Sequence, residues 1–549
     1  MKLFHINMKR YILFLVALCM SGMSLMAQQT AQIQQLIDSA RYEQAVQLCT
    51  TELKQYPKNG TLYRQRALAN LMQEQYGKAL QDMDMLLKYA KTSGWSVSEI
   101  YMLRAVIYYQ IKDYTQSIAD CTTAIKKDKK NDKAYAQRGA LYYEVENYSA
   151  ALADYQASSQ LSPTDDDYLV EVARCMLQLH RETEARTMLT SITLLYPHNA
   201  EAWRLSAVSA MLSGETTKFI DQYIHYLDLN YEQTGQWGDT DLLVSTAQKD
   251  YAYLLSAVSK QINSLTDYPQ AFYKGVRVRV YMEKGYYADA VGELNRMEKD
   301  ENEPNPFILA NRAECYQNMY QYRKAVADYN ALIQYNSNYL FGYLQRGVCY
   351  ASLGQYEKAI SDYTHIIENS PSYTMAYYAR AVAHTEQHNY DDALADVSRC
   401  IELSPSARAY FLRGRLQLIQ GDTAKATADF EQVLPIDTTT AGSVRQYALH
   451  YLGQDSAALA WMDSILVDYP SEGNYYDAAC LNALMGRTEQ ALAALDKALS
   501  LGYKDYFHIS IDTDLDAIRN LPRFAEILNK YRQQEVQSKF DLLKESNPE

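Results

Sequence analysis

The feature that most constrains the fold of this chain is a repeat of 34 residues. Arg312, Arg346 and Arg380 stand 34 positions apart, and an aspartate follows each of them after sixteen positions. The same spacing returns earlier in the chain, at Arg104 and Arg138. Self-similarity at a fixed period of roughly 20 to 50 residues is typical of chains that stack one supersecondary unit many times. With 549 residues, the chain is also too long for one compact core.

Each repeat has the pattern of two helices. In the repeat 340–373, Tyr343 and Tyr350 recur at helical spacing, Gly354 interrupts the pattern, and a second periodic run ends before Pro371. A small residue recurs at a fixed place in each helix, which lets two helix axes approach closely. The chain has 50 tyrosines against 11 phenylalanines. Because a tyrosine buries apolar area and keeps a polar tip, this composition favours a fold with much surface.

The chain resembles the tetratricopeptide-repeat family, whose 34-residue units carry Trp or Tyr, Gly or Ala, and Pro at set places. The segment AWRLSAVSAMLSGE has the family tryptophan at Trp203, and about fourteen units can be phased between residues 28 and 505. The resemblance implies an all-α fold. It would be an α-solenoid, a right-handed superhelix of about fourteen helix-turn-helix repeats with a C-terminal capping helix over its last open face.

We expect five segments along the chain. They are a signal peptide (1–27), an N-terminal repeat array (28–233), an irregular connection with a degenerate repeat (234–271), a C-terminal array (272–505), and a cap with a tail (506–549). The connection is indicated by NYEQTGQWGDTD, in which glycines and threonines break the rhythm. The cap is predicted from Pro522, which suits the first turn of a helix carrying Phe524, Ile527 and Leu528.

The first residues have the composition of a secretory leader. Lys2, Lys9 and Arg10 precede the apolar run YILFLVALCM, and SGMSLMA allows cleavage after Ala27. An uncleaved anchor is the weaker interpretation, because the run is shorter than the about 20 residues that a span needs. Lipidation of Cys19 is a further alternative, although a leucine precedes it where a small residue is usual. We therefore expect an exported protein of the periplasm or outer-membrane periphery, with no transmembrane span after the leader is removed.

Charge and cysteine content exclude two classes of protein. Removing residues 1–27 changes the net charge from −13 to −13 − 3 = −16, and no basic patch is evident, so nucleic acid is not an expected partner. Of eight cysteines, Cys19 leaves with the leader, and the remaining seven are widely spaced without a CxxC pair. This pattern argues against a disulfide framework.

The recurring arginine has a structural interpretation. It stands at the seventh place of the unit, where the family usually has leucine, and we compared that place with the twenty-third in fourteen windows. Arg and Asp occur together in seven windows, Arg277 and Glu293 in an eighth, five windows lack both, and Arg445 faces Trp461. Charges that appear and vanish together predict salt bridges within the unit. They are Arg66–Asp82, Arg104–Asp120, Arg138–Asp154, Arg312–Asp328, Arg346–Asp362, Arg380–Asp396 and Arg413–Asp429. A ladder of arginines that binds phosphate or carboxylate is the alternative, but it leaves the aspartates unexplained.

The sequence offers no catalytic motif. GxGxxG, Walker, GxSxG and HExxH patterns are absent. Cys175, Cys315 and Cys349 share one place in their units, which indicates small core residues and not nucleophiles. We expect no enzyme activity, no cofactor and no metal site.

The resemblance implies a concave groove lined by the first helices, faced by places two, five, nine, twelve and thirteen. The partner-binding residues expected there are Tyr109, Tyr143, Phe307, Phe341, Leu344, Met375, Tyr378 and Phe411. Apolar side chains in a groove are typical of a binding surface. The alternative is a groove closed by the superhelix itself or by the other array. We found no basic pair at these places of the kind that some family members use for a C-terminal carboxylate.

These observations predict a non-catalytic scaffold of the bacterial cell envelope that binds a protein or peptide in a tyrosine-rich groove. A ligand-binding component of an outer-membrane uptake system and an envelope chaperone are the alternatives. The bacterial assignment rests on the resemblance of the leader and the tail. The sequence indicates neither the partner nor the oligomeric state.

Overall fold

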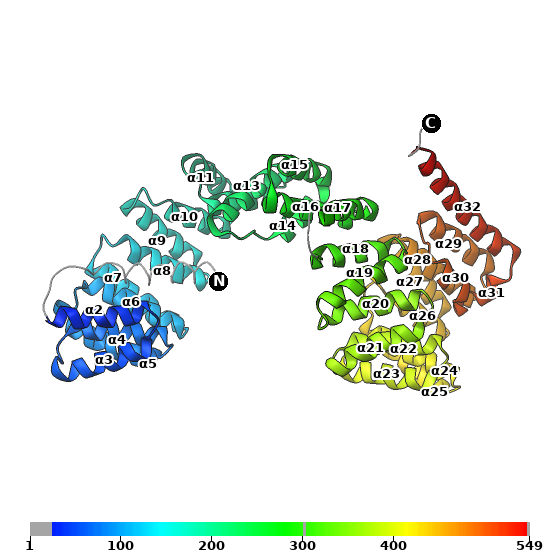
Figure 1. Ribbon diagram of the computed structural model, residues 1–549, viewed down its shortest axis with the longest axis horizontal. Coiled ribbons are helices and arrows are strands. Elements are labelled where there is room, and N and C mark those ends of the chain that lie inside the picture. The colour runs from blue at the N-terminus through cyan, green and yellow to red at the C-terminus, as the bar shows by residue number, and fades with distance from the viewer. Residues whose placement is uncertain (1–24, 300–303, 546–549) are drawn as a thin grey trace. The chain divides into compact units, whose positions relative to one another are not determined.

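The computed structural model describes residues 25–299 and 304–545, and over these residues the secondary structure is helical throughout (Figure 1). The chain divides into two compact units, up to Ala257 and from Val258 onward. This division lies within helix α15 (Tyr251–Ser264) and inside the segment 234–271 that the sequence marks as a connection. The predicted leader lies mostly outside the described residues. In these residues we find no helix both long and apolar enough to cross a membrane.

Unit 1 begins with helix α2 and reaches into α15. Its α-helices before α15 are α2 (Leu25–Asp38), α3 (Tyr42–Gln55), α4 (Gly60–Met72), α5 (Tyr76–Lys88), α6 (Val97–Gln110), α7 (Tyr114–Lys127), α8 (Asp132–Glu144), α9 (Tyr148–Leu161), α10 (Asp166–Gln178), α11 (Glu182–Leu195), α12 (Ala200–Leu212), α13 (Thr216–Thr234) and α14 (Thr240–Thr246). Two short 3-10 helices, η1 (Ala90–Thr92) and η2 (Ala247–Asp250), join them.

Unit 2 continues the series to the C-terminal helix. Its α-helices after α15 are α16 (Asp267–Glu283), α17 (Tyr287–Lys299), α18 (Pro306–Asn318), α19 (Tyr322–Tyr335), α20 (Leu340–Ser352), α21 (Tyr356–Asn369), α22 (Thr374–Glu386), α23 (Tyr390–Leu403), α24 (Ala407–Ile419), α25 (Thr423–Ile436), α26 (Arg445–Tyr451), α27 (Asp455–Asp468), α28 (Glu472–Leu484), α29 (Thr488–Leu501), α30 (Tyr506–Ile511), α31 (Asp516–Arg519) and α32 (Pro522–Glu545), with η3 (Thr513–Leu515) before α31. In the described residues, helices α2 to α29 form fourteen successive pairs, which confirms the predicted all-α solenoid.

In most pairs the turn has a left-handed residue at place fifteen. Gly354 has a φ of +69° and Gly421 has +83°, while Glu74, Lys112 and Tyr320 adopt the same region at 59°, 63° and 58°. A positive φ reverses the chain in few residues, and glycine adopts it without strain. Because other residues also occupy this place, a glycine there is not required by the turn alone.

Small residues at place eight let an aromatic ring lie against the helix backbone. A Cβ atom on Gly347 would come within 2.5 Å of the Tyr363 ring, and one on Gly414 within 2.7 Å of Phe430. Both rings belong to the second helix of the same repeat, and Tyr363 is 2% exposed. The predicted close approach of the two helices therefore has a direct cause, since the glycine provides the space that the ring fills.

Each of the seven Arg–Asp pairs forms a salt bridge between the two helices of one repeat. The shortest N–O distances are 2.6 Å in Arg66–Asp82 and Arg346–Asp362, 2.7 Å in Arg104–Asp120, Arg138–Asp154 and Arg413–Asp429, and 2.8 Å in Arg312–Asp328 and Arg380–Asp396. Arg277 and Glu293 pair at 2.6 Å. In six of the seven, Nε and Nη2 both donate to the aspartate, each to a different oxygen. The aspartates are buried.

The arginine also reaches back to the preceding repeat, which the sequence pattern did not indicate. Nη1 of Arg346 donates to Asn330 Oδ1 at 2.7 Å, and Nη1 of Arg380 donates to Thr364 Oγ1 at 2.9 Å. Arg66 and Arg138 make the equivalent bonds to threonines sixteen residues earlier. One guanidinium therefore joins three helices, because its planar fork presents donors on both sides.

The C-terminal residues cap the last repeat as predicted. Phe524, Ile527 and Leu528 on α32 are buried in one cluster with Leu495 of α29, and Ile518 of α31 joins them. Some residues between α29 and α31 contact earlier repeats of unit 2, since Asp505 bonds to Tyr322 and Asp514 to Arg415.

Candidate functional site

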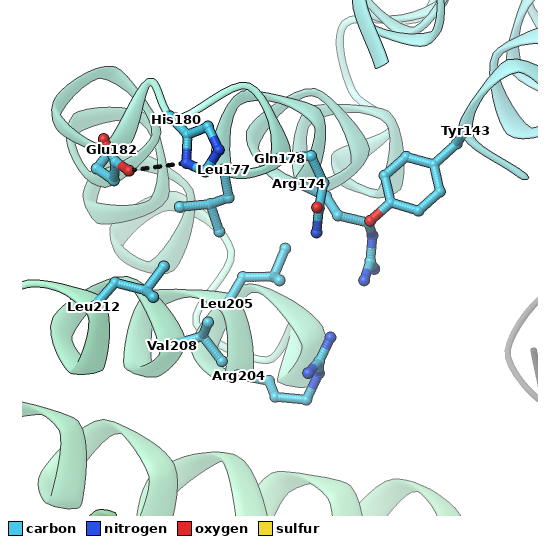
Figure 2. Close-up of a pocket in the computed structure, with 10 residues that line it drawn as sticks. All are labelled: Tyr143, Arg174, Leu177, Gln178, His180, Glu182, Arg204, Leu205, Val208 and Leu212. Atoms are coloured by element: carbon cyan, nitrogen blue, oxygen red, sulfur yellow. Dashed lines mark ion pairs between the residues drawn. The ribbon is translucent and has the colours of Figure 1, made fainter. Parts of the chain in front are cut away.

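A hollow of about 440 Å³ lies in unit 1, on the first helices of the repeats 132–165, 166–199 and 200–233 (Figure 2). Helix α8 contributes Tyr143, α10 contributes Arg174, Leu177 and Gln178, the following turn contributes His180, and α11 contributes Glu182. Helix α12 contributes Arg204, Leu205, Val208 and Leu212. Seven of these ten residues occupy places five, nine, twelve or thirteen of their repeats, which the family resemblance assigns to the groove. The hollow is therefore part of the predicted groove face.

Two arginines and two glutamates form a network at one side of the hollow. Arg174 Nε donates to Glu171 at 2.9 Å, and Arg174 Nη2 donates to Glu201 at 2.8 Å. Arg204 donates to the same Glu201 from Nη2 at 2.6 Å. Burial would raise the pKa of Glu201, but the hydrogen bonds and charges of Arg204 and Arg174 outweigh it and lower this pKa. Glu201 is thus a fixed anion that orients both guanidinium groups.

Each arginine keeps a donor for a ligand. Within the described residues, Arg174 uses Nε and Nη2 and Arg204 uses Nε and Nη2, and neither Nη1 makes a hydrogen bond. The apolar wall opposite is uneven, since Leu205 is buried and Leu212 is 57% exposed. Guanidinium N–H groups at one end of the hollow and an exposed leucine at the other suit an elongated ligand that combines a carbonyl or carboxylate oxygen with an apolar group.

These two arginines correct the expectation that the groove places carry no basic pair. They stand at place nine of repeat 166–199 and place five of repeat 200–233. Both repeats lack the Arg–Asp pair at places seven and twenty-three. In the sequence, they can be recognised as arginines at groove places of two neighbouring repeats.

The predicted partner-binding residues fall into three groups. Tyr143 lines the hollow, and Tyr109 is half-buried with its ring 5.8 Å from that of Tyr114. At the starts of α18, α20 and α22, an apolar side chain at place two is exposed: Phe307 by 44%, Phe341 by 47% and Met375 by 61%. These residues offer surface, and they are not among the residues that line the hollow of unit 1.

Three residues at place five offer little or no surface. Leu344 is 6% exposed, because it packs with Tyr363 of its own repeat and Ala376 of the next. Phe411 is half-buried, with its ring 5.7 Å from Tyr447 and 5.8 Å from Phe430. Tyr378 is half-buried against the cluster that contains Ala381 and Val397. The structure thus corrects the expectation that Leu344 faces a partner.

The groove face of unit 2 is in contact with residues 503–514 of the same chain, which we call the groove segment. Arg415 donates from Nη2 to Asp514 at 2.8 Å, and Tyr322 donates to Asp505 Oδ2 at 3.1 Å. A groove closed by the superhelix itself was the alternative expectation, and the contacts of the groove segment in unit 2 agree with it.

The cysteines lie in the core and not in a reactive setting. The seven of the described chain are free and buried. Burial raises the pKa of Cys175, Cys315 and Cys349 to about 12, so their thiols stay protonated near neutral pH. No group of three or more His, Cys, Asp or Glu in residues 25–299 and 304–545 could hold a metal ion.

Helix pairs stacked at a 34-residue period define a helical-repeat protein. Models of the tetratricopeptide repeat match residues 98–131, 142–208, 342–373 and 378–439, so the matches fall in both units. The chain is a tetratricopeptide-repeat protein. The comparison with curated protein sequences gives no significant match.

Solved structures of repeat proteins are similar to parts of the chain. The C-terminal part of a TPR repeat-containing protein from Cytophaga hutchinsonii has 14% identity and a TM-score of 0.35, and the match covers 42% of this chain and 93% of that one. A tetratricopeptide repeat protein from Parabacteroides merdae has 15% identity and a TM-score of 0.25, over 59% and 98%. YrrB, a TPR protein with an unusual peptide-binding site, has 16% identity and a TM-score of 0.28, over 38% and 96%.

Proposed function

We propose that this protein is a non-catalytic scaffold of the bacterial cell envelope, and that unit 1 binds a protein or peptide partner in the hollow beside Arg174 and Arg204. Tetratricopeptide repeats support a role in protein–protein interaction. The observation that carries the choice of site is the pair of glutamate-oriented arginines at one end of the hollow, each with Nη1 unused among the described residues, and the exposed Leu212 at the other end.

The partner segment would be an extended peptide with an apolar side chain next to a carbonyl or carboxylate oxygen. The apolar group would cover Leu212 and Val208, and the oxygen would accept from Arg174 or Arg204. Because both arginines are already oriented, little side-chain entropy is lost on binding. A strongly basic partner would meet these same two guanidinium groups and is disfavoured.

Two exposed leucines of unit 1 provide a matched test. Leu212 lines the hollow and is 57% exposed, whereas Leu194 near the end of α11 is 80% exposed and is not among the residues that line it. Three versions of the chain from Gln28 onward would be immobilised: the parent, Leu212→Glu and Leu194→Glu. Each would be incubated with an envelope extract and with a displayed library of random peptides. We expect Leu212→Glu to lose the captured protein and the selected peptides, and Leu194→Glu to keep both. Equal binding by all three proteins would contradict the proposed site.

Export is a separate part of the proposal. It is supported by the basic residues and the apolar run of the leader. Cell fractionation followed by N-terminal sequencing should find the protein outside the cytoplasm with Gln28 as its first residue. An intact N-terminus on cytoplasmic protein would contradict it.

A further inference from the structure

The groove segment contacts residues of the repeats 306–339, 340–373, 407–440 and 473–505. Its first residue, Tyr503, stacks on Tyr476 with ring centroids 4.4 Å apart and lies 6.0 Å from Tyr320. Two residues later Asp505 accepts the hydrogen bond of Tyr322. These contacts join the start of the segment to the repeat 306–339, almost two hundred residues earlier in the chain.

The middle of the segment depends on a glycine. Phe507 lies over the turn of the next repeat, where a Cβ atom on Gly354 would come within 2.7 Å of its Cζ. The same turn place holds Tyr320 in one neighbouring repeat and His388 in the other, so the turn itself accepts a side chain. Gly354 is therefore explained by the approach of Phe507, a residue that the repeat pattern does not contain.

The end of the segment carries carboxylates to polar groups of the groove face. Asp514 accepts from Arg415, which stands at place nine of its repeat, and Asp512 accepts from Tyr476 at 2.8 Å. Glu386 at place thirteen lies near the same carboxylates. Burial raises its pKa, and the charge of Asp512 acts in the same direction against those of His508 and Arg415. A positive groove residue thus meets an acidic segment.

Part of the segment packs into the core of the last repeat, since Ile509 is buried in that core and Tyr503 and Tyr506 pack against it. In α30 only Ile509 is buried, and Phe507 remains 42% exposed. Leu515, Ile518, Phe524, Ile527 and Leu528 follow in the chain and cover the last repeat. The solenoid end is therefore capped mainly by residues after the groove segment, while Asp514 of the segment reaches Arg415 at a groove place.

We propose that residues 503–514 are an internal ligand of the unit 2 groove, and that this groove accepts in their place an acidic, aromatic peptide from a partner protein. The segment supplies the chemistry of that partner: aromatic rings at Tyr503 and Phe507, and carboxylates at Asp505, Asp512 and Asp514. Binding of such a peptide requires release of the segment, so the resting protein has a closed groove in unit 2. This proposal concerns a different surface from the hollow of unit 1 and does not depend on it.

Two glycines at the same place of the turn give a matched test. Gly354→Asn places a side chain against Phe507, whereas Gly421→Asn makes the same backbone change at a site with no atom within 4 Å. Hydrogen exchange of residues 503–514 would be measured in the chain from Gln28 onward. We expect at least tenfold faster exchange in Gly354→Asn and parent-like exchange in Gly421→Asn. Equal exchange in the two variants would overturn the internal-ligand assignment.

Binding in trans is measured with a labelled peptide of the sequence YKDYFHISIDTD. We expect Gly354→Asn to bind it at least tenfold more tightly than the parent, and a scrambled peptide to bind neither. Adding Arg415→Glu to Gly354→Asn should abolish the binding. Phe507→Ala opens the segment without a change in the turn, and it replaces Gly354→Asn if that variant does not fold. Binding of the peptide equal to that of the scrambled control would overturn the proposal.

Discussion

The groove faces of the two units use the same repeat place in different ways. Arg174 in unit 1 and Arg415 in unit 2 both stand at place nine. Arg174 is neutralised by Glu171 of its own repeat and Glu201 of the next, whereas Arg415 pairs with Asp514, ninety-nine residues further on. The carboxylate comes from a neighbouring position in unit 1 and from a distant part of the chain in unit 2. A local glutamate leaves the groove open, and a distant aspartate brings a length of chain into it.

The largest effect is expected from the shared framework. Arg138→Ala in unit 1 and Arg346→Ala in unit 2 each leave a buried aspartate without its partner, which should lower the free energy of unfolding by about 3 kcal/mol. Calorimetry should show the loss in the transition of the unit that carries the change, with peptide binding retained in the folded protein. The double variant Arg346→Leu, Asp362→Leu should regain most of the stability. If Arg346→Ala abolished binding at unchanged stability, the arginines would be ligand-binding residues.

A smaller effect on the groove segment is expected from Arg415 and not from Arg174, the other arginine at place nine. Arg415→Ala leaves Asp514 unpaired in a partly buried site and should weaken the closed state of the groove segment by about 2 kcal/mol. Exchange of residues 503–514 should rise accordingly, and Arg174→Ala should leave that exchange unchanged. A similar rise in both variants would show that the two grooves are not independent.

A buried carboxyl near the end of the groove segment should also give a pH dependence. Burial raises the pKa of Asp477 from 3.8 to about 6, against the hydrogen bond of Tyr447 and the charge of Arg408, while Asp512 and Asp514 add to the rise. A raised carboxyl pKa means that the folded chain binds the proton more tightly, so this contribution to stability is lost as pH rises through about 6.

Asp477→Asn should therefore stabilise unit 2 by about 1–2 kcal/mol at pH 7.5 and change little at pH 4.5. Thermal unfolding at the two pH values provides the measurement. A stabilisation of equal size at both values would mean that the carboxyl is not charged differently across this range.

The smallest effect concerns one hydroxyl. Tyr322→Phe removes the hydrogen bond to Asp505 and should increase exchange of the groove segment about fivefold, which corresponds to about 1 kcal/mol. Tyr335→Phe on the same helix is the control, since Tyr335 is 61% exposed. No difference between the two variants would remove Tyr322 from the contacts that keep the segment in place.

The sequence predicted what repeats and missed what occurs once. Arg346 and Asp362 could be paired because seven repeats show the same two charges at the same two places. Small residues such as Gly347 could be assigned to close helix packing for the same reason. The fold followed from this periodicity, because every repeat contacts chiefly its neighbours.

The groove segment could not be predicted, since its contacts have no period. Asp514 meets Arg415 over ninety-nine residues and Asp505 meets Tyr322 over 183, and neither distance is a multiple of 34. Leu344 was misplaced because the family's assignment of place five to the groove does not say how deeply the next repeat covers it. Arg174 and Arg204 stand at groove places in the sequence, but Glu201 brings them together only in the folded chain.

The place-seven arginine donates from Nη1 to the preceding repeat, and this bond can form again when a whole repeat is removed. Excision of residues 340–373 would put Arg380 sixteen residues after Asn330, the acceptor that Arg346 uses now. Excision of 98–131 would likewise bring Arg138 to Asp84, the present acceptor of Arg104. Deletion of either repeat therefore leaves the next arginine with an acceptor in the preceding repeat. Unit 1 is free to change length in this way, whereas the groove segment must still reach from Tyr476 to Tyr322, which fixes the number of repeats in unit 2.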